Sequence, residues 1–135
     1  MTKKMEYLLL VFILILIVIA SISLGFISKS KKKDNSITVE SFDVGNYQSF
    51  IENFSSEESL GSISNAEDAI TKAETVWVKI YGNQVKDEKP YKVFYDKENQ
   101  IWLITGSLRP NTLGGVAYIL LENDTGKVLA VWHDK

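Results

Sequence analysis

The last 22 residues of this 135-residue chain, GGVAYILLENDTGKVLAVWHDK, contain two apolar runs separated by a polar turn. The turn residues NDTG tolerate positive φ, and the pattern therefore predicts a β-hairpin. Successive side chains of a strand point to opposite faces, so a half-buried strand alternates apolar and polar residues. These two strands instead carry apolar or aromatic residues on both faces. Helices of the domain can cover one face of a sheet that contains these strands. The other apolar face then needs either strong curvature of the sheet over a pocket or a partner that covers it.

An uninterrupted alternation assigns every residue of this hairpin to one of two faces. On the first strand, one face receives Val116, Tyr118 and Leu120, and the other receives Ala117, Ile119 and Leu121. On the return strand, one face receives Val128, Ala130 and Trp132, and the other receives Leu129, Val131 and His133.

The run from Tyr7 to Ile27, YLLLVFILILIVIASISLGFI, carries no charge. As a helix it would be about 30 Å long, the thickness of the hydrocarbon core of a bilayer. It has no polar stripe, which a buried helix of a soluble protein would need. We therefore expect a basic N-terminal tail (residues 1–6) and a single transmembrane helix (residues 7–28). A cleaved signal peptide is the alternative, with Ser21 and Ser23 near a cleavage site, although the apolar run exceeds the usual length.

Lysines flank the predicted span unequally. Two lie before it and four after it, namely Lys3 and Lys4, then Lys29, Lys31, Lys32 and Lys33. Positive charge is retained on the cytoplasmic side, so this bias favours a cytoplasmic domain at the cell membrane. A short basic tail can also stay inside and send the domain out.

Charge is distributed very unevenly along the chain. Residues 1–33 hold six lysines and one glutamate, a net charge of +5, whereas residues 34–135 hold nine basic and sixteen acidic residues, a net charge of −7. Residues 34–68 contain eight acidic residues and no basic one. This segment is either a solvated linker or a surface for a basic partner. Binding of nucleic acid by the domain is not expected, because phosphates require a basic patch.

Two helices are predicted after a polar tether (residues 29–45). Tyr47, Phe50, Ile51 and Phe54 have the i, i+3, i+4, i+7 spacing of a short amphipathic helix that starts at Gly45 or Asn46. The second helix covers residues 66–81, where apolar residues recur every three or four positions. Ser64 and Glu67 form a capping-box pattern at its start, and Gly82 and Asn83 supply left-handed residues at its end.

From Pro90 onward the apolar period changes from helical to two. The runs YKVFY and QIWLITGSL are joined by DKEN, and RPNTLGG is a longer loop before the C-terminal hairpin. The four strands predict an antiparallel meander preceded by helices, an α+β domain spanning residues 46–135. It is expected to be a monomer or a homodimer.

Few residues in the chain could perform catalysis or bind a metal. It has one histidine, His133, and no cysteine, so thiolate sites and disulfides are excluded. A Ser-His-Asp arrangement could use Asp134, but adjacent strand residues face opposite ways, so Asp134 is not expected to orient His133. The stretch NTLGG lacks the lysine and the helix N-terminus of a phosphate loop. We expect no catalytic residue, metal or cofactor, and a locally hydrogen-bonded His133.

Residues 66–135 show a family resemblance. The ordered runs AITKAETVWVKIYG, KPY, IWLITGSL, P…GGVAYI and TGKVLAVWHDK closely resemble a family of bacterial immunity proteins that neutralise polymorphic toxins. That family has the nuclear-transport-factor-2-like (cystatin-like) fold. Two positions depart from the pattern of that family. Lys89 stands where the family usually has an arginine, and Arg109 stands directly after Gly-x-Leu, where the family often has a proline. The resemblance implies a bent antiparallel sheet wrapped around helices and no catalytic residues.

The resemblance predicts a membrane-anchored, non-catalytic immunity protein that binds one cognate toxin. An acidic surface would suit a basic, nucleic-acid-cleaving toxin. The alternative is a membrane-anchored pocket domain that binds a small molecule or a cell-envelope component. An enzyme on this fold would need an acid–base pair that the sequence does not reveal. The candidate partner-binding residues are Tyr91, Trp102, Arg109, Tyr118, Trp132 and His133.

Overall fold

The computed structural model describes residues 2–24 and 36–135, which belong to two compact units, Met1–Asn35 and Ser36–Lys135. The first unit contains one helix, α1 (Lys3–Leu24). Across residues 2–24 and 36–135, none of the helices has both the length and the apolarity that crossing a bilayer requires. Residues 25–28 of the predicted span and residues 29–35 of the predicted tether lie outside the described residues.

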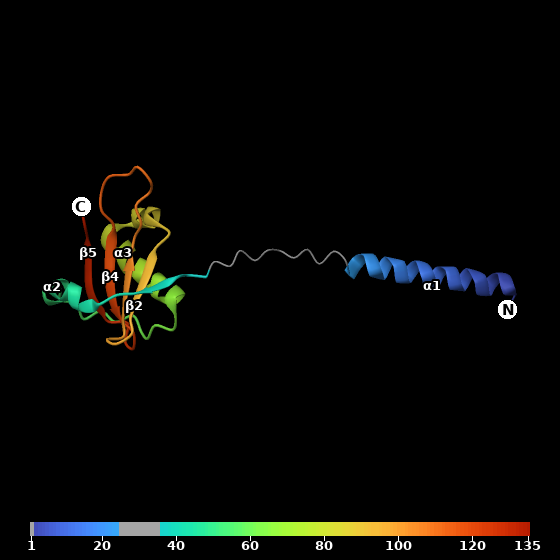
Figure 1. Ribbon diagram of the computed structural model, residues 1–135, viewed down its shortest axis with the longest axis horizontal. Coiled ribbons are helices and arrows are strands. Elements are labelled where there is room, and N and C mark those ends of the chain that lie inside the picture. Colours follow the sequence, from blue (N-terminus) through green and yellow to red (C-terminus); the bar gives the residue numbers. More distant parts are fainter. Residues whose placement is uncertain (1, 25–35) are drawn as a thin grey trace. The chain divides into compact units, whose positions relative to one another are not determined.

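The second unit is an α+β domain built on a five-stranded sheet with strand order β1-β2-β3-β4-β5 (Figure 1). The strands are β1 (Val39–Ser41), β2 (Lys92–Asp96), β3 (Ile101–Thr105), β4 (Ala117–Glu122) and β5 (Val128–His133). The antiparallel meander of β2 to β5 is confirmed. The prediction of four strands was wrong, because β1 adds a fifth by pairing in parallel with β2. All three residues of β1 are exposed, so its sequence carries no alternation that could reveal a strand.

The domain also begins earlier than expected. The compact unit starts at Ser36, and both β1 and the 3₁₀ helix η1 (Val44–Tyr47) lie at least partly within residues 29–45, the predicted tether. A short α helix, α2 (Gln48–Glu52), follows η1 directly. The amphipathic segment predicted there is therefore helical, but its first turn is 3₁₀ and starts at Val44, capped by the side chain of Asp43.

Helix α3 (Ala66–Tyr81) has the predicted bounds, with a cap displaced by one residue. Asn65, not Ser64, is the N-cap, and its Oδ1 accepts a hydrogen bond from the backbone N–H of Asp68 at 2.9 Å. The Asp68 carboxylate in turn accepts from the N–H of Ser64 at 2.9 Å. Gly82 ends the helix with φ of 82°. Asn83 instead begins a second 3₁₀ helix, η2 (Asn83–Glu88), which the sequence analysis did not predict.

Helix α3 covers one face of the sheet. Trp77 is fully buried there and its ring meets that of Tyr91 edge to face, with the ring centroids 5.2 Å apart. Its Nε1 donates to the carbonyl oxygen of Tyr118 at 3.3 Å. The other buried residues of this core are Ile63, Ala69, Ala73, Val76, Val85, Val93, Trp102, Ile104, Ala117, Ile119, Leu121 and Val128.

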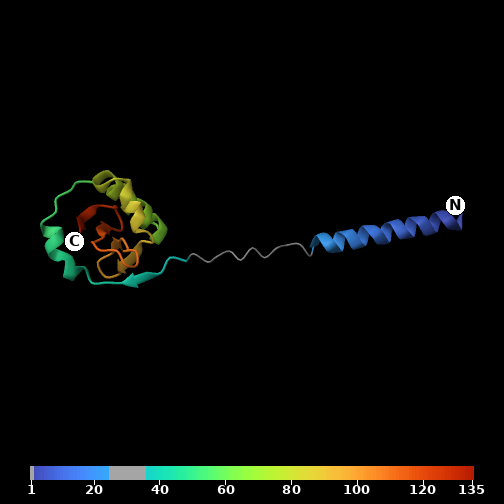
Figure 2. The same cartoon turned by 90° about the horizontal axis from the view of Figure 1, so that it is seen from above.

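The N-terminal segment of the domain covers the opposite face. Leu103, Leu120 and Ala130 are buried on that face, at 2% exposure or less. The side chains that pack on them are Phe42, Tyr47, Ile51, Phe54, Phe94, Ile101, Tyr118, Leu129 and Trp132. Figure 2 shows the chain from β1 through α2 to α3 passing around the sheet. The second apolar face is thus covered by the chain itself.

The carboxylate of Asp96 joins this N-terminal segment to the sheet. Asp96 is 5% exposed and lies at the end of β2. Its Oδ2 accepts from the N–H of Val44 at 3.0 Å, and its Oδ1 accepts from the N–H groups of Glu98 and Asn99 at 3.0 and 2.9 Å. Hydrogen bonds from Asn99 and from the Val44 backbone hold the pKa of this carboxyl below its usual value. One side chain therefore fixes both the β2–β3 turn and the start of η1.

A β-bulge at Leu129 changes the faces predicted for β5. Leu120 pairs with Ala130 and Leu121 pairs with Val128, which leaves Leu129 as the extra residue. An extra residue shifts the alternation of the strand that contains it. Val128 consequently packs in the core beneath α3, and Ala130 packs on the opposite face. The prediction that these two residues share a face was wrong, because nothing in the local pattern marks the bulge.

Replacement of Trp102 by alanine tests the burial of the sheet face that α3 covers. The residue is 8% exposed, and its Nε1 donates to Asn123 Oδ1 at 2.8 Å. We expect Trp102→Ala to lower the free energy of unfolding by about 3–5 kcal/mol, because a buried aromatic ring is replaced by a cavity. Ile80→Ala is the control at a site that is 53% exposed, with an expected loss of less than about 0.5 kcal/mol. Equal losses in denaturant melts of the two variants would contradict this packing.

Candidate functional site

Two of the candidate partner-binding residues lie in the core. Tyr91 is 9% and Trp102 8% exposed. The hydroxyl of Tyr91 lies 2.9 Å from Glu74 Oε2 and 3.2 Å from the carbonyl oxygen of Val85. Burial, followed by the hydrogen bond to Glu74, raises the pKa of Tyr91. A partner could therefore reach these two rings only if the domain rearranged.

Two further candidates form an aromatic stack on the second face. The rings of Tyr118 and Trp132 are nearly parallel, with an angle of 7° and centroids 5.0 Å apart. Phe50 of α2 stacks on Trp132 at 4.1 Å and is itself 41% exposed. Burial, helped by a hydrogen bond to Asp134, raises the pKa of Tyr118 to about 12. The stack fastens α2 to the sheet and leaves part of Phe50 at the surface.

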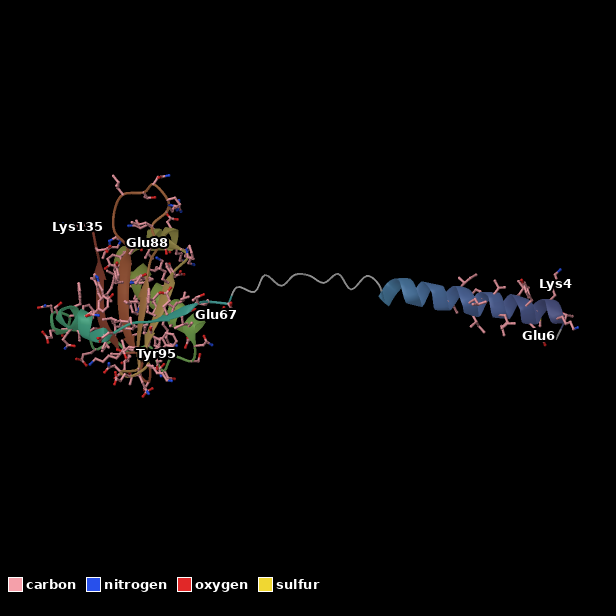
Figure 3. All side chains as sticks on the ribbon, in the orientation of Figure 1. Lys4, Glu6, Glu67, Glu88, Tyr95 and Lys135 are labelled. Atoms are coloured by element: carbon pink, nitrogen blue, oxygen red, sulfur yellow. The ribbon has the colours of Figure 1, made fainter. Side chains whose placement is uncertain are left out.

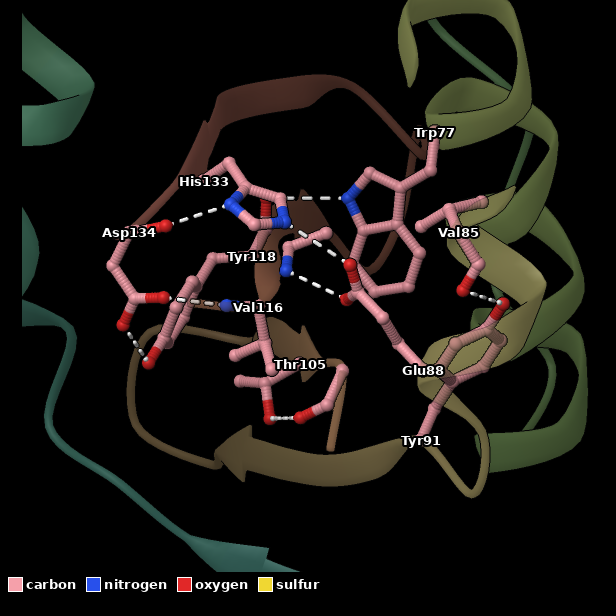
Figure 4. A network of polar contacts seen from close by, with 11 residues as sticks. Trp77, Val85, Glu88, Tyr91, Thr105, Val116, Tyr118, His133 and Asp134 are labelled. Carbon is pink, nitrogen blue, oxygen red and sulfur yellow. Dashed lines mark hydrogen bonds and ion pairs between the residues drawn. The ribbon is translucent and has the colours of Figure 1, made fainter. Parts of the chain in front are cut away.

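His133 lies at the end of β5, with both ring nitrogens next to an acceptor (Figure 4). Nδ1 is 2.7 Å from the carbonyl oxygen of Asp134, and Nε2 is 3.0 Å from Glu88 Oε1. A carbonyl and a carboxylate only accept, so both nitrogens must carry a proton for both bonds to form. This geometry selects the charged imidazolium. The ring also meets that of Tyr81 edge to face, with the centroids 5.6 Å apart.

Glu88, which the sequence analysis missed, is the partner of His133. It ends η2, and 45 positions separate the two residues in the chain. Its Oε2 accepts from the N–H of Ala117 at 2.8 Å, and its carbonyl oxygen accepts from the N–H of Ser107 at 2.8 Å. A Cβ on Gly106 would lie 2.0 Å from Oε2, so this position has room only for glycine. The close approach was not visible in the sequence, because it depends on where η2 docks.

Asp134 binds the other end of the same loop. Its Oδ1 accepts from the N–H of Val116 at 2.6 Å, and its Oδ2 accepts from the hydroxyl of Tyr118 at 2.8 Å. The prediction that Asp134 cannot orient His133 was wrong for the backbone: the Asp134 carbonyl oxygen lies 2.7 Å from His133 Nδ1, while the Asp134 carboxylate bonds Val116 and Tyr118 instead. Glu88 and Asp134 together hold the start and the end of residues 107–115. We call Glu88, His133 and Asp134 the loop-base network.

The loop-base network lies at one end of the domain, where Figure 3 also places Lys135, while Tyr95 lies toward the other end. Arg109, the remaining candidate, projects from the loop itself. Its Nη2 is 3.4 Å from Asp87 Oδ1, and the two side chains are 67% and 75% exposed, so this ion pair adds little stability. The candidates Arg109, Tyr118 and His133 are thus brought to the same end, and Tyr91 and Trp102 are not surface residues.

Two open depressions flank this loop. One has a volume of about 460 Å³ and includes Lys92, Tyr118 and Asp134 in its lining. The other has a volume of about 260 Å³ and includes Asp87, Arg109 and Leu113. Within residues 2–24 and 36–135, no three His, Cys, Asp or Glu side chains are grouped to hold a metal ion. The arrangement presents a protruding loop between two shallow surfaces.

The fold and the sequence together define the class of this protein. The order of helices followed by an antiparallel meander around a packed core is that of an α+β domain of the NTF2-like type. The family described as NTF2 fold immunity protein matches residues 68–135, from the first turn of α3 to the chain end. The chain belongs to this family, which confirms the resemblance. No curated protein and no solved structure matches it.

The loop-base network predicts a specific pH dependence of stability. Partial burial lowers the pKa of His133, but hydrogen bonds to Glu88 and to the Asp134 carbonyl raise it by more, so its net pKa lies above the usual 6.5. A raised pKa contributes stability that is fully present below about pH 6.5 and is lost as pH rises through the folded-state value. We expect the melting temperature of the wild type to exceed that of His133→Gln by more at about pH 5.5 than at about pH 9.

His133 is the only histidine of the chain, so the difference between the two proteins isolates its titration. A difference that stays constant across this range would show that the imidazolium pair contributes nothing.

Proposed function

We propose that this chain is a non-catalytic immunity protein that binds and neutralises one cognate polymorphic toxin. The observation that carries the proposal is its membership of the NTF2 fold immunity protein family, whose match covers α3 from Asp68 onward and all four strands of the meander. Immunity proteins commonly act by occluding the active site of the toxin. Such a role needs an exposed recognition surface and no reacting groups of its own.

The surroundings of the histidine favour binding over catalysis. A general base needs an unprotonated atom within reach of its substrate. Both nitrogens of His133 already face acceptors, at 2.7 and 3.0 Å, so neither is free to take a proton. The Glu88 carboxylate is likewise occupied by the N–H of Ala117 and by the imidazole. These groups hold backbone in place, which suits a positioning role.

The packed core favours a protein partner over a small ligand. A pocket domain of this type would need a cavity between the helix and the sheet. Trp77, Tyr91 and Trp102 fill that space, at 0%, 9% and 8% exposure. The two depressions beside the loop are open at the surface and do not enclose a ligand, as small-molecule sites usually do. A toxin surface is the occupant that fits such a protein.

Co-expression tests the immunity function. The product of the gene beside this one is the first toxin candidate to test, and we expect a bacterial host that expresses the cognate toxin to grow only when the full-length chain is also expressed. The two proteins should co-purify in a 1:1 ratio. The control is the toxin with its catalytic residue replaced, which should bind without needing neutralisation. Cell death despite a folded, abundant chain, together with no co-purification, would contradict the proposal.

We further propose that residues 7–28, of which residues 25–28 lie outside the part of the chain that the structure describes, anchor the chain as a single transmembrane span with the domain in the cytoplasm. The uncharged run from Tyr7 to Ile27 supports the anchor, and the excess of lysines after it supports the orientation. Alkaline phosphatase fused after Lys135 should be inactive and a fluorescent protein bright, with both found in the membrane fraction. An active phosphatase would reverse the orientation, and a soluble full-length fusion would contradict the anchor.

A further inference from the structure

We propose that residues 107–115 are the part of the domain that enters the toxin. Leu108 and Leu113 would occupy a concave apolar site on the toxin surface, and the loop-base network would hold the loop in its binding conformation. This proposal rests on the immunity function proposed above and names the contact through which it acts.

The exposure of the loop points to a contact. Leu113 is 98% exposed and Leu108 is 48% exposed. Arg109 is the only charged residue from Gly106 to Val116, and it already pairs with Asp87. The tip therefore presents two exposed leucines beside a single exposed arginine. A protruding apolar tip is complementary to a concave apolar site, which is the form of many enzyme clefts.

The tip of the loop is also ordered by its own turn. The N–H of Thr112 donates to the carbonyl oxygen of Arg109 at 3.2 Å. Pro110 follows Arg109, and Asn111 has φ of 60°, which is the pattern of a type II turn with proline second and asparagine third. A loop that is ordered before binding loses less conformational entropy on binding. This turn therefore favours recognition by the loop in the conformation that it already has before binding.

Three hydrogen bonds from backbone N–H groups hold the base of the loop. The carbonyl and carboxylate of Glu88 receive the N–H groups of Ser107 and Ala117, and the Asp134 carboxylate receives that of Val116. His133 joins these two anchors through its two ring nitrogens. Loss of one ring proton breaks one of these two hydrogen bonds. The loop conformation and the charge of His133 are therefore linked.

The charged and titratable groups around the His133 imidazole come from three parts of the chain. Glu88 faces it from η2, the ring of Tyr81 faces it from α3, and Asp134 follows it in the chain. Glu88 and Asp134 favour the charged form of His133, and partial burial opposes it. Toxin binding through a loop that needs the charged form would therefore weaken as pH rises.

A protein partner fits this loop better than a lipid surface. The part of the chain from residue 34 onward carries a net charge of −7, which opposes approach to anionic lipid. The loop contains no tryptophan or tyrosine, the residues enriched at membrane interfaces. We therefore assign the loop to the toxin.

Binding of the neighbouring gene's toxin to full-length variants in detergent tests the contact. Leu113→Asp should raise the Kd about 30-fold, as expected for a central contact residue. Its side chain is almost fully exposed, so the fold should be unaffected. Ile80→Asp is the matched control, with a 53% exposed aliphatic residue on α3, and should change the Kd less than about threefold.

The outcomes separate the two proposals. If the wild type binds and Leu113→Asp binds equally well, the loop assignment is overturned and the immunity function stands. If the wild type does not bind the toxin at all, both proposals fail.

The positioning role of His133 has its own readout. The Kd of the wild type should rise as pH increases from about 6 to about 9, and His133→Gln should bind weakly with no such trend. Glu88→Gln, which keeps an acceptor for the Ala117 N–H, should also lose the trend and serves if the histidine variant is unstable. The same pH dependence in wild type and both variants would overturn the linkage between His133 and the loop.

A fluorophore on a single introduced cysteine can show whether the loop contacts the toxin or the lipid. The label attaches only there, because the chain contains no cysteine of its own. A polarity-sensitive fluorophore on Thr112→Cys, an exposed position beside Leu113, in full-length protein reconstituted into phosphatidylglycerol-containing vesicles, should shift to the blue only when toxin is added. A blue shift in the vesicles alone would assign the loop to the membrane and overturn the proposal.

Discussion

A sheet that is apolar on both faces is the constraint on which this domain depends. Leu103, Leu120 and Ala130 point away from α3 and would be exposed if the domain consisted only of α3 and the meander. Residues 36–54 prevent this by running around the sheet and packing Tyr47 and Ile51 on that face. Apolar area removed from water is the main favourable term in folding. The N-terminal segment is therefore part of the core and not a linker.

The same arrangement supports the proposal that recognition takes place at one end of the domain. Both faces are covered, and Trp77, Tyr91 and Trp102 lie buried between α3 and the sheet, where a pocket domain would need its cavity. The loop between β3 and β4 extends from the sheet, and polar groups from η2 and the chain end hold its base. Loops carried on a rigid scaffold commonly provide binding residues. The scaffold here leaves the apolar tip of this loop unburied.

Local periodicity was enough to predict α3 and the four strands of the meander, because the spacing of their apolar residues matches 3.6 or 2. It was not enough for features created by distant contacts. β1 is exposed throughout, Leu129 is extra only relative to β4, and Glu88 meets His133 only after η2 docks. Among the candidate site residues, composition identified the aromatic group but could not tell the buried Tyr91 from the partly buried Trp132.

Amide hydrogen exchange of the full-length chain, with and without its toxin, tests the central claim most directly. That claim is that a covered sheet presents one loop, residues 107–115, to the toxin. We expect slower exchange in residues 107–116 on binding and unchanged exchange along the exposed side of α3. Protection confined to β1 and α2, with the loop unchanged, would contradict it.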